Sequence, residues 1–135
     1  MQIMTPKLLG KCLAACREEL SRTLSADGQG EPNKSLHMDA SALLDITAWR
    51  ILTPFIVSLS AGVTAAAINS KWIMRQPIKG LQQTLEERVG QPIRVDPART
   101  EECVILIEEI LRPFAANRAQ ARKIVEVLTS TAQDD

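Results

Sequence analysis

Apolar residues recur every three or four positions along most of this chain, which is the spacing of one face of an α-helix. The pattern is first seen over residues 5–25, at Leu9, Cys12, Leu13, Cys16, Leu20 and Leu24. A Thr-Pro pair at its start supplies a capping hydroxyl and a residue suited to the first helical turn. We predict an amphipathic helix over 5–25 that packs against the rest of the chain.

The middle of the chain is much more apolar. Residues 26–38 contain two glycines and a proline among small polar residues and predict a flexible loop. An apolar helical region, 39–76, follows. Pro54 either kinks a helix that is already running or starts a new one, and we expect the central helix to be 54–76, ending before Pro77.

The last part of the chain returns to amphipathic patterns. We expect a short helix and an extended linker over 77–96, then a helical hairpin over 97–130. Val104, Leu106 and Val127 lie off the apolar stripes of the hairpin and need a further surface to cover them. The residues expected to dock this hairpin onto a protein partner or the rest of the chain are Ile107, Ile110, Leu111, Ile124 and Leu128.

Strand signals are weak in this chain. Residues 91–96 could form one isolated extended segment, but no segment alternates strictly between apolar and polar positions. We therefore predict a single all-α domain, 1–135, with five or six helices around one central, nearly uncharged helix at about 54–76.

The stretch 51–70 carries no charge and could form a single transmembrane helix. Twenty residues of helix span about 30 Å, the thickness of the hydrocarbon core of a bilayer. Trp49 and Arg50 precede the stretch and Lys71 and Trp72 follow it, which is typical of membrane-interface anchors.

A row of small residues supports self-assembly of such a helix. Ser58, Gly62 and Ala66 share one helical face and would let two helices approach closely in lipid. The cations that follow the stretch would place the C-terminal part in the cytoplasm.

A soluble interpretation stays open. Pro54 and Asn69 shorten the strongly apolar part to about fifteen residues, which is more typical of a buried helix. The flanking amphipathic helices could wrap a central apolar helix within a cytoplasmic, water-soluble domain.

Charge and composition narrow the function further. The chain has 16 basic and 16 acidic residues, so it lacks the basic excess of a general nucleic-acid binder. Its three cysteines are an odd number without framework spacing, which argues against a secreted disulfide scaffold.

The polar residues do not complete a chemical site. Cys12, Cys16, Cys103 and the only histidine, His37, lack the spacing of a zinc site. Glutamates on the helix after Asp96 and arginines on the last helix are expected to form solvated faces that pair with each other. We therefore predict no catalytic residue, metal or cofactor.

These observations lead to a functional expectation. We expect a non-enzymatic helical interaction or assembly protein that is membrane-associated and self-assembles through the apolar helix 51–70. Its partners would be further copies of itself and another protein, with nucleic acid disfavoured. The alternative is a soluble cytosolic adaptor, or a subunit of a larger complex, with 54–76 as its buried core helix.

Overall fold

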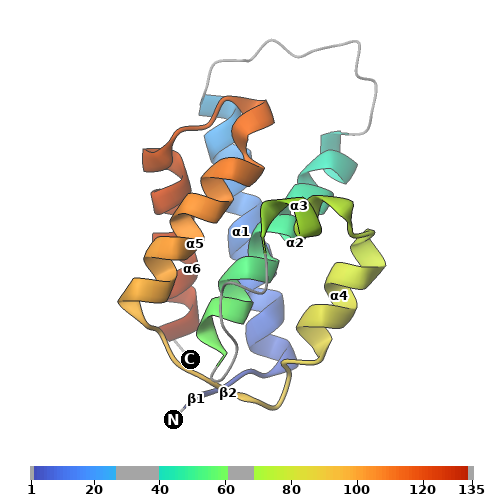
Figure 1. The fold of residues 1–135 in the computed structure, drawn as a ribbon, viewed down its shortest axis with the longest axis vertical. Helices are drawn as coiled ribbons and strands as arrows, with labels where there is room; N and C mark the ends of the chain where they lie inside the picture. The colour runs from blue at the N-terminus through green and yellow to red at the C-terminus, as the bar shows by residue number, and fades with distance from the viewer. Residues whose placement is uncertain (1, 27–39, 61–68, 134–135) are drawn as a thin grey trace.

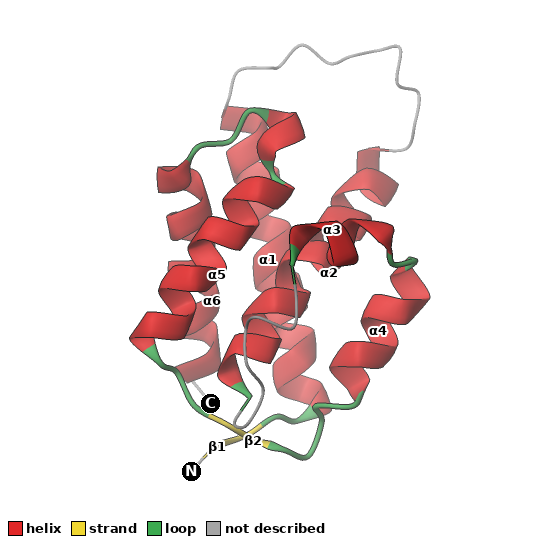
Figure 2. Ribbon diagram, in the orientation of Figure 1, coloured by secondary structure: helices red, strands yellow, loops and turns green. Residues whose placement is uncertain are grey.

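The computed structural model describes residues 2–26, 40–60 and 69–133. Within these ranges the chain forms six α-helices and two very short strands (Figures 1 and 2), so the all-α prediction is confirmed. The elements are β1 (Gln2–Ile3), α1 (Pro6–Ala26), α2 (Ala40–Leu59), α3 (Ser70–Arg75), α4 (Ile78–Glu86), β2 (Pro92–Ile93), α5 (Pro97–Ile110), the 3₁₀ helix η2 (Arg112–Phe114) and α6 (Arg118–Gln133).

Helix α2 is the centre of the molecule. It packs against α1, α4 and α5, and Figure 1 shows α4 and α5 on opposite sides of it with α3 crossing in front. Every residue in the run 51–60 is buried. An apolar helix that packs against amphipathic neighbours gains the burial of its own surface and of theirs.

The bounds of the central helix differ from the expected 54–76. Pro54 lies inside α2, so the helix that begins at Ala40 continues through it. Proline removes one helical hydrogen bond, a local cost that tertiary burial of the surrounding turns can exceed. The carbonyl that loses its helical donor is that of Arg50, four residues before Pro54. The Thr53 hydroxyl donates to a different carbonyl, that of Trp49, at 2.8 Å. A new helix, α3, begins only after Asn69, whose side chain accepts from the backbone amide of Trp72.

A small antiparallel sheet joins the N-terminus to the linker before α5. Gln2 pairs with Ile93 and Ile3 with Pro92, and an isolated bridge joins Ser60 to Ile93. The extended linker was predicted, whereas its partner β1 was not, since two residues are too short to show a strand pattern. This sheet fixes the lower end of α2 against the start of α5.

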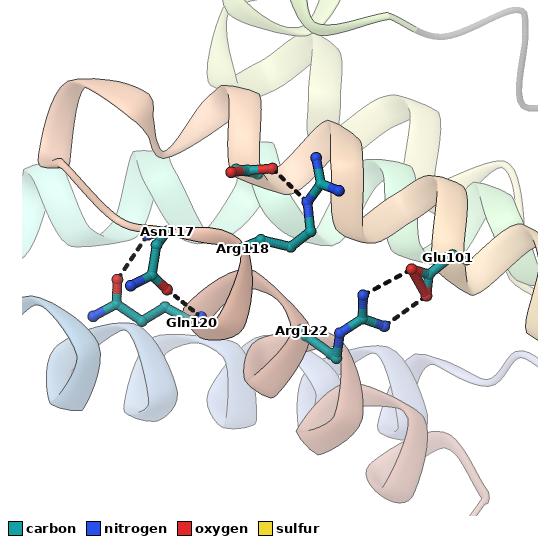
Figure 3. Close-up of polar contacts among 6 residues, drawn as sticks. Glu101, Asn117, Arg118, Gln120 and Arg122 are labelled. Carbon is teal, nitrogen blue, oxygen red and sulfur yellow. Dashed lines mark hydrogen bonds and ion pairs between the residues drawn. The ribbon is translucent and has the colours of Figure 1, made fainter.

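The two C-terminal helices begin at identifiable caps. The Asp96 carboxylate accepts from the amide of Ala98 at 3.0 Å, and Pro97 occupies the first turn of α5. Helix α6 begins at Arg118, where Asn117 and Gln120 form a reciprocal capping pair at 2.8 and 2.9 Å (Figure 3).

Candidate functional site

A groove with a volume of about 310 Å³ opens between α2, α5 and the start of α3. We name it the α2–α5 groove. Buried Pro54 and Val57 contribute from α2, and Leu106 and exposed Ile105 contribute from α5. Its other lining residues are Ser58, Asn69, Arg99, Glu102, Cys103 and Glu109.

Several polar groups of the α2–α5 groove are already paired within the chain. Arg99 donates to the carbonyl of Ser60 at 2.8 Å. Ser70, at the start of α3, donates to Glu109 at 2.8 Å, and the Ser58 hydroxyl donates to the carbonyl of Phe55 at 2.6 Å. The groove therefore offers apolar contact with charged edges, and the described residues that line it include no histidine that could activate Ser58.

A second groove, of about 480 Å³, lies between α1, α2 and the end of α4. Its apolar lining includes Leu9 and Leu13 from α1, Trp49 from α2 and Val89 after α4, all of them half-buried. Gly10 borders it, and a Cβ at that position would meet nothing within 4 Å. The large hydrophobic residues exposed among the described residues are Ile3, Met74 and Ile105, so none lines this groove.

The expected membrane anchors do not bracket one helix. Trp49 and Arg50 lie in the middle of α2, whereas Lys71 and Trp72 lie on α3. Both tryptophans are partly buried against the hydrophobic core. The two Trp-cation pairs therefore belong to separate elements, and the stretch 51–70 is not one continuous described helix.

The expected helix–helix row is described only in part. Ser58 is on α2 with 5% of its surface exposed, while Gly62 and Ala66 lie outside the described residues. Whether this row mediates assembly therefore stays a prediction.

The docking residues of the hairpin form the inner faces of α5 and α6. All five are no more than 2% exposed and belong to the hydrophobic core: Ile107, Ile110, Leu111, Ile124 and Leu128. Helix α5 packs on α2, and α6 packs on α1. These side chains therefore attach the hairpin to the rest of the chain, and a partner would have to use other residues.

Ion pairs join the outer faces of α5 and α6. Arg122 makes two hydrogen bonds to Glu101, at 2.6 and 2.8 Å, and Arg118 donates to Glu108 at 2.8 Å (Figure 3). The hydrogen bonds from Arg122 hold the pKa of the Glu101 carboxyl below its usual value. The expected pairing of an acidic with a basic helix face is thus present, and both arginines bind carboxylates of the chain itself.

The three cysteines are buried and unbridged. Burial, with a smaller contribution from Cys12, raises the pKa of the Cys16 thiol to about 12, and burial also raises the pKa of Cys103. The Cys16 thiol lies 3.8 Å from the carbonyl of Ala48. Such thiols behave as small core residues and not as nucleophiles.

Metal binding stays untested for part of the chain. Within the described residues, no group of three His, Cys, Asp or Glu side chains could hold a metal ion. His37 lies outside those residues, so the absence of a metal stays a prediction.

Comparisons of this chain with protein-family models, with curated proteins and with solved structures found no match.

Proposed function

We propose that this chain is a non-enzymatic helical interaction module, which folds in water around α2 and binds a protein through the α2–α5 groove. The observation that carries the proposal is the run of buried residues 51–59 on the apolar helix α2. The chain's own helices supply the apolar surroundings that lipid would otherwise provide.

The burial of α2 favours the soluble alternative over the transmembrane one. One helix of the described residues, over Ala42–Leu59, is long and apolar enough to cross a bilayer, and 61% of that window is buried inside the fold. Moving this helix into lipid would uncover the apolar faces of α1, α4 and α5 that pack on it. Burial of a large apolar side chain contributes about 1.5–3 kcal/mol, so this exposure would be very unfavourable.

A peripheral membrane contact is the second candidate function. Lys71, Met74 and Arg75 are exposed on α3, next to half-buried Trp72. Apolar and cationic side chains on one short helix are typical of a surface that lies on anionic lipid. In this second candidate function, α2 stays buried inside the protein and only α3 contacts the lipid surface.

The non-enzymatic part of the proposal is supported by the chemistry of the two grooves. Their lining is mainly apolar, and the hydrogen bonds of Ser58, Arg99 and Glu109 go to the chain itself. Affinity in such a site comes from apolar contact, with specificity from charges at the edge.

Fractionation of the full chain tests the solubility on which the proposal depends. We expect the protein in the supernatant of a detergent-free lysate after ultracentrifugation, with a single cooperative thermal transition by circular dichroism. We also expect it to stay at the bottom of a flotation gradient that contains neutral phosphatidylcholine vesicles.

Two results would contradict the proposal in different ways. Recovery only with detergent would restore the transmembrane interpretation. Flotation with vesicles that contain phosphatidylserine, but not with neutral ones, would favour the peripheral contact through α3.

A further inference from the structure

We propose that the second groove, between α1, α2 and the end of α4, binds a small amphiphilic cation, which is an ammonium group on an apolar chain. We name this site the α1–α4 groove. Among the described residues it shares no lining residue with the α2–α5 groove, so the inference adds a ligand site to the proposed function. Its volume of about 480 Å³ lies within the range of about 300–1,000 Å³ that is usual for small-molecule sites.

The apolar part of the ligand lies against side chains from three parts of the fold. Leu9 and Leu13 come from α1 and Trp49 comes from α2, and the lining also includes Pro6 and Val89. All of these except Pro6 are half-buried, so each keeps apolar surface that the chain itself does not cover. An alkyl chain in the groove removes that surface from water, which favours binding.

Gly10 keeps space open in the α1–α4 groove. It lines the groove from within α1, although glycine inside a helix is less favourable than alanine. The described fold does not require a glycine here, because its backbone does not adopt a positive φ and a Cβ would meet nothing within 4 Å. The absent side chain leaves room for an occupant that contacts the backbone of α1.

Glu86 gives the α1–α4 groove its charge. Among the described residues that line the groove, it is the only one with an ionised side chain. Glu86 is exposed, and the ion pairs among the described residues do not include it. It is also the last residue of α4, where the helix dipole disfavours a negative charge. A cation in the groove pairs with this carboxylate, whereas an anion is repelled by it.

Two residues that are unfavourable for their own helices, Gly10 and Glu86, thus line one groove. Departures from the local rules of helix formation are expected at functional sites. Trp49 adds an indole ring, the aromatic group that attracts cations most strongly. Open space, uncovered apolar side chains, an unpaired carboxylate and an indole together match an ammonium group on an apolar chain better than an anion or an uncharged chain.

The first test uses decylamine as the probe, because it carries an ammonium group at neutral pH on a linear alkyl chain. The chain has 2 tryptophans, so in a Trp72→Phe protein the fluorescence of Trp49 reports on the groove. We expect a saturable change with a dissociation constant on the order of 100 µM. Decanoate, an alkyl chain with the opposite charge, should bind at least about tenfold more weakly.

The second test removes the carboxylate of the groove. Glu86→Gln should weaken decylamine binding about threefold to fivefold, since an exposed ion pair is partly screened by water. It should also reduce the preference for decylamine over decanoate. Glu87→Gln is the matched control, because Glu87 is exposed beside Glu86 in the sequence but does not line the groove, and both affinities should stay unchanged.

The third test fills the groove. Gly10→Leu adds a side chain that begins in open space, so it should weaken decylamine binding at least about tenfold. The thermal midpoint should be unchanged or higher, since leucine favours a helix more than glycine does. Ser21→Leu is the matched control, because Ser21 is exposed on α1 and does not line the groove.

Three outcomes would overturn the inference. The first is a folded protein that shows no saturable binding of decylamine up to about 1 mM. The second is binding of decanoate as tight as that of decylamine. The third is a folded Gly10→Leu protein that binds decylamine like the wild type. Circular dichroism of every variant separates loss of binding from loss of folding, and each of these outcomes leaves the proposed function of the α2–α5 groove unchanged.

Discussion

Replacing Phe55 by alanine should lower the free energy of unfolding by about 3–5 kcal/mol, the usual cost of removing a fully buried aromatic side chain. Phe55 is on α2 and has no exposed surface. A domain of this size is stable by only about 5–15 kcal/mol, so the variant should lose much of its stability. Urea unfolding of the full chain, followed by circular dichroism, measures the change.

The control for Phe55→Ala is an apolar truncation on the surface. Ile3→Ala removes a side chain that is 42% exposed and should cost about 1 kcal/mol or less. Equal effects of the two substitutions would show that α2 is not the core of the folded protein in water.

The buried thiols of the folded chain should react very slowly. Because burial raises the pKa of Cys16 from 9.0 to about 12, its thiolate fraction near pH 8 should fall roughly a thousandfold, and its reaction with a disulfide reagent such as DTNB should slow in proportion. Limited access to Cys16 and Cys103 would slow it further. The measurement compares labelling in native buffer and in urea. Rapid native labelling of these thiols would contradict their burial.

The raised pKa of Cys16 also predicts how the stability of the folded chain depends on pH. The unfolded chain releases the Cys16 proton near pH 9.0, whereas the folded chain holds it to about pH 12. Well below pH 9 the Cys16 thiol is protonated in both the folded and the unfolded state, so it adds no pH dependence to the free energy of unfolding. Between these values the unfolded state binds fewer protons, so the free energy of unfolding falls as the pH rises.

Two local rules, the spacing of apolar residues and the presence of capping residues, predicted the helices well where both agreed. The predicted helix 5–25 closely matches α1 (Pro6–Ala26), and Asp96 caps α5 as its Asp-Pro sequence suggests. The same rules failed at Pro54, because the packing of α2 on three helices exceeds the local cost of one proline. Strand β1 escaped prediction, since its pairing with β2 is set by a contact distant in sequence.

The candidate site was harder to predict than the fold. The α2–α5 groove combines residues from two helices with Asn69, the cap of α3, and no local spacing in the sequence places Val57 of α2 and Leu106 of α5 in one groove. The one local signal was that Leu106 lies off the apolar stripe of its helix and needs a further surface. The Trp-cation pairs flank 51–70 in the sequence, and the fold places them on two separate helices, α2 and α3.

Hydrogen exchange of α2 tests the central claim of this account most directly. Peptides that cover residues 51–59 should be among the slowest to exchange in detergent-free buffer, because opening this helix requires its neighbours to separate. Adding lipid vesicles should leave their exchange unchanged. Fast exchange of these amides in water, followed by protection only when lipid is present, would contradict the account and identify α2 as a membrane helix.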